Sequence, residues 1–165
     1  MTRIIAGEAR GRRLVAPKGE TTRPTSDRAK EAIFSSWSTR FGLEGTRVLD
    51  LFAGSGALGL EAASRGARSV VLVENDPNAI AAIEKNIRTV GHPDVALSPM
   101  KVSSYLAGAP GEPFDRVIAD PPYELVGEAV TEMLEALRSF LAPGAVVTVE
   151  RHRDDAVSYT HLTLP

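Results

Sequence analysis

One stretch near the centre of the chain combines a strand, a turn and a helix start: Val48-Leu49-Asp50-Leu51-Phe52-Ala53-Gly54-Ser55-Gly56-Ala57-Leu58-Gly59. The apolar run at 48–52 predicts a buried strand. The three glycines that follow are spaced G-x-G-x-x-G. This spacing favours a tight turn, close approach of a ligand to the backbone, and exposure of the N–H groups that open a helix. The pattern is typical of adenosine-bearing cofactors, and taken alone it fits NAD as well as S-adenosylmethionine.

Short apolar runs and helical stretches alternate from about residue 46 onward. The pattern predicts further strands at 69–74, 95–97, 114–120 and 145–150, and helices at 57–65, after Pro77, at 103–106 and at 128–141. Such alternation predicts an α/β fold of Rossmann-like type, in which a mostly parallel sheet carries helices on both faces. Ligands of these sheets bind outside the carboxyl ends of the strands, where Asp50, Glu74 and Asp120 are expected.

Two of these acids favour S-adenosylmethionine as the cofactor. Glu74 ends the strand after the glycine loop, about twenty residues on, where a carboxylate can accept hydrogen bonds from both ribose hydroxyls. Asp50 stands before the first glycine, where a carboxylate would repel a pyrophosphate and attract an ammonium and a sulfonium. The alternative role for Asp50 is a helix or turn cap. An NAD-dependent oxidoreductase, which rests on the glycine loop alone, is the rival from another class.

The tetrapeptide Asp120-Pro121-Pro122-Tyr123 follows the strand at 114–120. Its prolines fix an extended, rigid turn and remove two backbone donors. The Pro121 carbonyl and the Asp120 carboxylate would then form an acceptor pair for the two protons of an exocyclic amine, and the Tyr123 ring could stack on a flipped base. A plain proline loop explains neither the acid nor the aromatic residue. The motif therefore predicts methylation of an exocyclic amino group of a nucleic-acid base.

The N-terminal segment differs in charge from the rest of the chain. Residues 1–40 contain nine Lys/Arg and four Asp/Glu, whereas the remainder contains ten and seventeen. A basic segment on an acidic body is expected where a polyanion binds; the alternative is a solvated, charged arm. We expect residues 1–40 to form a basic hairpin and helix extension, and 41–165 a single methyltransferase domain. The hairpin would pair 3–5 with 13–15, and a helix capped by Thr25 or Ser26 would use Ile33, Phe34 and Trp37 for core packing.

These motifs resemble those of one known family. Asp120 to Tyr123 is similar to the (Asp/Asn)-Pro-Pro-(Tyr/Phe) signature of amino methyltransferases, and 50–62 resembles the cofactor loop of the bacterial 16S ribosomal RNA guanine-N2 methyltransferases, the RsmD-like family. The segments Arg3-Ile4-Ile5-Ala6-Gly7, Gly11-Arg12-Arg13-Leu14 and Arg23-Pro24-Thr25-Ser26-Asp27-Arg28 are similar to that family's opening, and they narrow the resemblance to it. The resemblance extends to about residue 151.

The resemblance implies methyl transfer from S-adenosyl-L-methionine to N2 of a guanine in 16S ribosomal RNA, within a 30S subunit or an assembly intermediate. The implied catalytic residues are Asp120, Pro121, Pro122 and Tyr123. The implied cofactor-binding residues are Asp50, Phe52, Ala53, Gly54, Ser55, Gly56, Glu74, Asn75, Asp76, Ser103 and Thr25. The implied RNA-binding residues are Arg3, Arg10, Arg12, Arg13, Arg23 and Arg28.

Composition and length bound the remaining possibilities. The chain has no cysteine, its three histidines lack metal-ligand spacing, and no apolar run approaches ~18 residues. We therefore expect a cytoplasmic monomer without a metal or membrane partner. A DNA adenine-N6 or cytosine-N4 methyltransferase shares both motifs, but the chain leaves no room for a separate target-recognition domain. A non-catalytic RNA-binding module with the same fold is a further alternative.

The sequence departs from the family pattern in two places. Many members carry an acid after the third strand, where this chain has Lys101-Val102-Ser103; the backbone or the Ser103 hydroxyl would then hold the adenine amino group. Such sheets also have two further strands after the one that ends here at Glu150. Only fifteen residues follow it, so we expect a truncated or altered C-terminus after about residue 155, which would leave the last strands missing and a sheet edge exposed.

Overall fold

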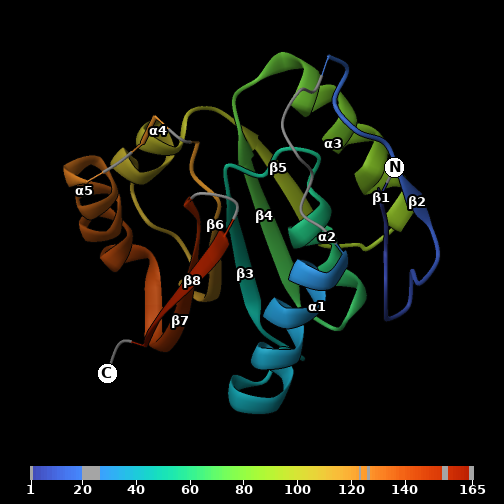
Figure 1. Cartoon of the computed structure of the whole chain (residues 1–165), viewed down its shortest axis with the longest axis horizontal. Helices are drawn as coiled ribbons and strands as arrows, with labels where there is room; N and C mark the ends of the chain where they lie inside the picture. Colours follow the sequence, from blue (N-terminus) through green and yellow to red (C-terminus); the bar gives the residue numbers. More distant parts are fainter. Residues whose placement is uncertain (1, 20–26, 123, 126, 154–155, 164–165) are drawn as a thin grey trace.

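The computed structural model describes residues 2–19, 27–122, 124–125, 127–153 and 156–163, with the backbone alone from 151 onward (Figure 1). Its main sheet has six strands in the order β5-β4-β3-β6-β7-β8. The strands are β3 (Arg47–Leu51), β4 (Ser69–Glu74), β5 (Val95–Pro99), β6 (Phe114–Ala119), β7 (Leu141–Arg153) and β8 (Ala156–Thr163). All neighbours pair in parallel except β7 and β8, which are antiparallel. The predicted α/β class and mostly parallel sheet are confirmed.

Helices cover both faces of this sheet (Figure 1). One face carries α1 (Asp27–Ser36), α2 (Ala57–Ser64) and α3 (Pro77–Val90), and the other carries α4 (Val102–Ala107) and α5 (Glu128–Leu137). Alternation along β3 separates the two cores: Val48 packs in the core below α2 and α3, whereas Leu49 and Leu51 pack in the core below α4 and α5. This two-sided burial explains why the strands read as nearly continuous apolar runs.

The N-terminal extension shares the first of these cores. Strands β1 (Thr2–Arg3) and β2 (Arg13–Leu14) pair antiparallel, which confirms the hairpin. Ile33, Phe34 and Trp37 are buried, as core packing predicts, and the Trp37 indole N–H donates to the Thr148 hydroxyl of β7 at 3.1 Å. A short π-helix, η1 (Trp37–Phe41), completes the connection to the sheet. The expected caps at residues 25 and 26 lie outside the described residues.

Two boundaries near the C-terminus differ from the sequence-based expectation. Helix α5 ends at Leu137, a 3-10 turn η2 (Arg138–Phe140) follows, and β7 already begins at Leu141. Pro143 and Gly144 therefore lie inside β7, where the pairing with β6 shifts register, because proline cannot donate to a regular ladder. Strand β8 follows β7, so one of the two further strands typical of such sheets is present within the described residues.

Candidate cofactor and base site

The glycine loop joins β3 to α2 by a sharp reversal of the chain. Phe52 has φ +60°, a conformation that is unfavourable for a bulky side chain and that is found mostly where function requires it. Gly54 and Gly56 follow with φ +59° and +82°. Gly59 has a different role: a Cβ at this position would lie 2.3 Å from Cδ2 of Leu72 on β4. Its lack of a side chain lets α2 lie directly on the sheet.

Glu74 ties this loop to the end of β4. Its carboxylate accepts backbone hydrogen bonds from Gly54 at 2.8 Å, Asn75 at 3.0 Å and Asp76 at 2.9 Å. A carboxylate offers about four acceptor directions, so capacity remains for a ribose hydroxyl. Asp76 itself caps α3 by accepting from the Ala79 N–H at 2.9 Å. Of the predicted adenine neighbours, Asn75 lines the adjacent cavity, whereas the Asp76 side chain is used by the helix.

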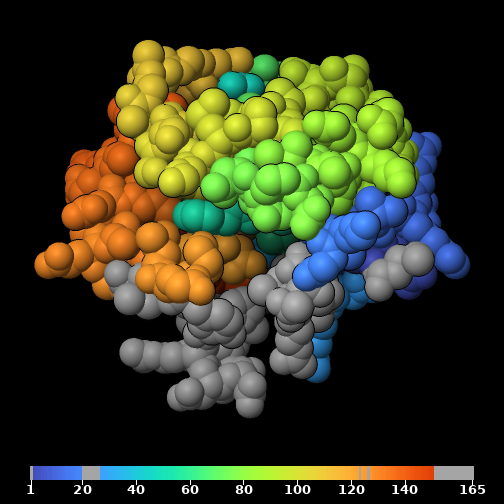
Figure 2. All heavy atoms as spheres, turned by 90° about the horizontal axis from the view of Figure 1, so that it is seen from above, coloured from blue at the N-terminus to red at the C-terminus, as the bar shows by residue number. Residues whose placement is uncertain are grey.

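A cavity of about 540 Å³ opens beside Glu74, between the rim of the sheet and helices α4 and α5. It is lined by Phe52, Val73, Glu74, Asn75, Met100, Lys101, Val102, Ser103, Leu106, Ala107, Leu125, Ala129, Glu132, Met133 and Ala136. Figure 2 looks onto this rim, where teal atoms that follow β3 show between the green segment after β4 and the orange segment with α5. A volume of this size, with mostly apolar walls and few polar groups, suits a nucleoside-sized ligand.

Several cavity residues follow from the sequence and others do not. Phe52, Glu74, Asn75 and Ser103 were predicted to contact the cofactor, and all four line the cavity. The apolar wall was missed, including Met100, which is 39% exposed although it is a large hydrophobic residue. An exposed methionine directly after a strand end is the signal that could have indicated it. Thr25 lies outside the described residues.

Asp50 lies deeper than the other acids of the rim. It is only 2% exposed, and its Oδ2 accepts the N–H of Gly59 in the first turn of α2 at 2.9 Å. The alternative role as a helix cap is thus observed. Burial, with smaller contributions from the charges of Asp120, Glu74 and Glu150, raises the pKa of Asp50 to about 8. Four carboxyl groups at the ends of four neighbouring parallel strands therefore lie close enough together to influence one another's charge.

The Asp-Pro-Pro segment leaves the sheet at the end of β6. Pro121 is buried, Pro122 is exposed, and the Pro122 carbonyl accepts the N–H of Leu125 at 2.9 Å, which closes a turn. Tyr123 lies outside the described residues. The structure adds Glu150 to the site, a buried residue of the neighbouring strand β7 that was not among the predicted site residues. An acid level with Asp120 on the next parallel strand is the same signal that identified the other three.

The acids of this rim favour a cationic ligand, because a nearby positive charge would lower the raised pKa values of Asp50 and Glu150 and stabilise their ionised forms. None of the ion pairs found within the described residues neutralises Asp50, Glu74 or Glu150. Among the same residues, no group of three or more Asp, Glu or His side chains has the geometry of a metal site. A ligand with an ammonium and a sulfonium would be attracted here, whereas a pyrophosphate would be repelled. The donor set and the cavity therefore fit S-adenosylmethionine and disfavour a dinucleotide.

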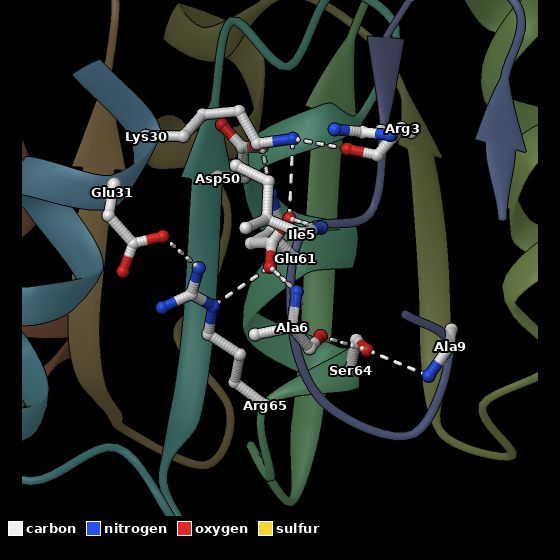
Figure 3. Close-up of polar contacts among 11 residues, drawn as sticks. Arg3, Ile5, Ala6, Ala9, Lys30, Glu31, Asp50, Glu61, Ser64 and Arg65 are labelled. Carbon is white, nitrogen blue, oxygen red and sulfur yellow. Dashed lines mark hydrogen bonds and ion pairs between the residues drawn. The ribbon is translucent and has the colours of Figure 1, made fainter. Parts of the chain in front are cut away.

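The N-terminal arm is fixed to the helix that follows the glycine loop (Figure 3). Glu61 of α2 accepts the backbone N–H groups of Ile5 at 2.9 Å and Ala6 at 3.1 Å. It also pairs with Lys30 at 3.3 Å and with Arg65 at 2.8 Å, and the side chains of Lys30 and Glu61 are fully buried. Because buried charges persist only when they are paired, this cluster holds the arm, α1 and α2 in one arrangement.

The predicted RNA-binding arginines divide into three groups. Arg3, Arg10, Arg13 and Arg28 are exposed. Arg12 instead uses its guanidinium to donate to the carbonyls of Thr89 at 3.1 Å and Val90 at 2.9 Å, where it caps the C-terminus of α3. Arg12 is exposed like the other four, so this capping role stands beside the predicted contact with RNA. Arg23 lies outside the described residues.

The sheet order, the glycine loop, the acid at the end of β4 and the acidic rim together define a Rossmann-like S-adenosylmethionine-dependent methyltransferase. Comparison with known proteins narrows this class. The family model described as "Conserved hypothetical protein 95" matches residues 2–163. The chain belongs to this family, which contains the RsmD proteins.

Individual relatives agree with this assignment. Ribosomal RNA small subunit methyltransferase D of Haemophilus influenzae is 37% identical over 157 residues, which cover 92% of this chain and 79% of the relative. The protein of the same name from Escherichia coli is 38% identical over 150 residues, covering 90% and 73%. The structure of a hypothetical protein from Thermus thermophilus superposes with a TM-score of 0.85 at 31% identity, covering 98% of this chain and 99% of that one.

The described part of the chain contains no helix with the length and apolar character needed to cross a membrane.

Proposed function

We propose that this enzyme transfers a methyl group from S-adenosylmethionine to the exocyclic N2 of a guanine in small-subunit ribosomal RNA. The family relatives named as small-subunit ribosomal RNA methyltransferases support the substrate class. The Asp-Pro-Pro segment beside the acidic rim supports an exocyclic nitrogen as the acceptor atom. The resemblance of 23–28 and of the opening hairpin to the guanine-N2 family supports guanine over adenine or cytosine.

The residues around the cofactor have separate tasks in this proposal. Glu74 binds a ribose hydroxyl, Asp50 and the loop glycines face the methionine part, and Ser103 meets the adenine at the cavity wall. When bound, the cofactor supplies an electrophilic methyl carbon on a sulfonium, whose carbon–sulfur bond breaks as the new nitrogen–carbon bond forms. The rim acids attract the cationic ligand and orient it within the cavity.

Asp120 and Pro121 hold the acceptor amine. The Asp120 carboxylate and the Pro121 carbonyl accept its two protons, which directs the nitrogen lone pair toward the methyl group. Tyr123 stacks on the base. Asp120 need not be a strong base, because the amine becomes acidic only when it is methylated; its proton then passes to the Asp120 carboxylate and on to solvent. Orientation and exclusion of water supply most of the rate enhancement.

The exposed arginines of the extension contact the RNA backbone. Arg3, Arg10, Arg13 and Arg28 present their charges on an otherwise acidic protein, where they can bind phosphates. The Glu61 cluster fixes part of this basic segment to α2, next to the cofactor loop. The RNA would therefore be presented to the same rim that binds the cofactor.

The observation that carries the proposal is the convergence of Asp50, Glu74, Asp120 and Glu150 on one rim beside the glycine loop. The test is transfer of tritium from methyl-labelled cofactor to unmodified 30S particles, naked 16S RNA and duplex DNA. We expect label in the ribosomal RNA, with the duplex DNA unlabelled. Label in DNA alone would favour an adenine or cytosine methyltransferase. Binding of RNA without transfer of label would favour a non-catalytic module.

A further inference from the structure

Glu150 lies beside Asp120 in the rim. In the parallel pairing of β6 with β7, Ala119 lies opposite Val149, so the next residues of the two segments, Asp120 and Glu150, are neighbours. Glu150 is only 2% exposed, and its side chain is hydrogen-bonded to the side chain of Asp120. Its Oε2 is buried and has no hydrogen-bond partner within the described residues. A buried polar atom without a partner is costly, so its retention calls for an explanation other than fold stability.

We propose that Glu150 is a positioning residue for methyl transfer, whose carboxyl holds Asp120 so that an oxygen of Asp120 faces the exocyclic amine of the target base. The inference rests on the proposed function and assigns a task to a residue outside the Asp-Pro-Pro-Tyr motif. Asp120 follows the last residue of β6, whereas Glu150 is anchored inside β7. A hydrogen bond from a fixed carboxyl removes rotational freedom from the carboxylate that must be aimed.

Ionisation of Glu150 would reverse this effect. Burial and the charge of Asp120 raise the pKa of Glu150 to about 7. The ionisable groups that face it are Asp120 of the β6 end and Asp50 of β3, whose own pKa is raised in part by Glu150. No basic side chain of the described residues forms an ion pair with Glu150. When Glu150 loses its proton, two adjacent carboxylates repel one another and the hydrogen bond to Asp120 is lost.

The first test compares Glu150→Gln and Glu150→Leu, with the exposed Glu84→Gln as the matched control. Glutamine still donates to Asp120 and cannot ionise, so we expect a kcat close to that of the wild type at acidic pH, without the decline through neutral pH that ionisation of Glu150 causes. Leucine cannot donate, so we expect kcat to fall by roughly tenfold or more. The KM for the cofactor and the free energy of unfolding of the leucine variant should stay close to those of the wild type. A leucine variant with the wild-type kcat and pH profile would overturn the proposal.

A second test needs no RNA. Carbon-13 NMR titration of the side-chain carboxyls should place Glu150 near pH 7 in the wild type and lower in Asp120→Asn, whose amide carries no charge. An unchanged titration in Asp120→Asn would overturn the pairing. Failure of the proposed function would instead be seen as absence of methyl transfer by the wild type, so the two failures are distinguishable.

Discussion

Glu74 and Gly54 are joined by a hydrogen bond of 2.8 Å between the carboxylate Oε1 and the backbone N–H. The bond connects the end of β4 to the glycine loop at the end of β3, twenty residues earlier in the chain. The acid that would bind the ribose is therefore also the group that shapes the loop around the methionine part. Ligand affinity and loop geometry depend on the same carboxylate.

Glu74→Ala should weaken binding of S-adenosylhomocysteine by roughly 10- to 100-fold, because hydrogen bonds to a charged group are each worth about 1.5–3 kcal/mol. Isothermal titration calorimetry measures the change directly. Glu84→Ala, on the exposed side of α3, is the control and should bind as the wild type does. Equal affinity of the Glu74 variant and the control would contradict the assigned role.

Gly59→Ala should destabilise the fold, because its new Cβ would lie 2.3 Å from the Leu72 side chain. We expect a loss of about 1–3 kcal/mol in the free energy of unfolding, as for other overpacked sites. Urea denaturation gives this value. Gly111→Ala is the matched control, since a Cβ there meets nothing within 4 Å. Similar stabilities of the two variants would argue against close packing of α2 on the sheet.

Asp50→Asn should separate stability from cofactor binding. The folded-state pKa of Asp50, about 8, lies above its ordinary value of 3.8, so the folded state binds more protons than the unfolded state between these values. The stability contributed by Asp50 is complete below pH 3.8 and is lost as the pH rises through 8. Urea unfolding from about pH 5 to about pH 8.5 should therefore show the asparagine variant gaining on the wild type as the pH rises.

The same variant should bind S-adenosylmethionine more weakly, because asparagine cannot ionise to form a negative charge facing the cation. In the wild type, binding of the cation should lower the pKa of Asp50 and release protons at about pH 7. Calorimetry in buffers of different ionisation enthalpy measures this release, which should shrink in Asp50→Asn. Proton uptake on binding would be the opposite of the expected result.

Lys30→Met should destabilise the protein by about 3 kcal/mol, because it leaves the buried Glu61 with one fewer compensating charge. Arg138→Met, which breaks the exposed pair of Arg138 with Glu135, is the control and should change stability little. Chemical denaturation gives the free energy of unfolding of both variants and of the double variant Lys30→Met/Glu61→Leu. An unchanged free energy of unfolding in Lys30→Met would show that this cluster does not hold the arm.

Much of the site could be predicted because it follows from local sequence rules. The glycine spacing determines the turn, and an acid at the end of each parallel strand must lie on the common rim. The alternation between Val48 and Leu49 likewise predicts burial on both faces of the sheet. These features depend on neighbours in sequence, so a single chain carries enough information to place them.

The features that were missed depend on contacts between distant segments. No local pattern singles out Lys30 and Glu61, because only the contact between α1 and α2 buries these two charges together. The hydrogen bonds of Arg12 to the end of α3 were not predicted, because they depend on where the hairpin packs against that helix. Glu150 is an acid at a strand end, like Asp50 and Glu74. Its position beside Asp120 follows from the pairing of β6 with β7, which sequence periodicity does not specify. The early start of β7 reflects the same tertiary pairing.

Nucleoside mass spectrometry of 16S RNA tests the proposed methylation of guanine N2. Unmodified 30S particles are first incubated with S-adenosylmethionine and either the wild type or Asp120→Ala. The proposed function predicts N2-methylguanosine with the wild type and none with Asp120→Ala, while both bind S-adenosylhomocysteine with similar affinity. Methylated adenine or cytosine in place of N2-methylguanosine, or undiminished methylation by Asp120→Ala, would contradict it.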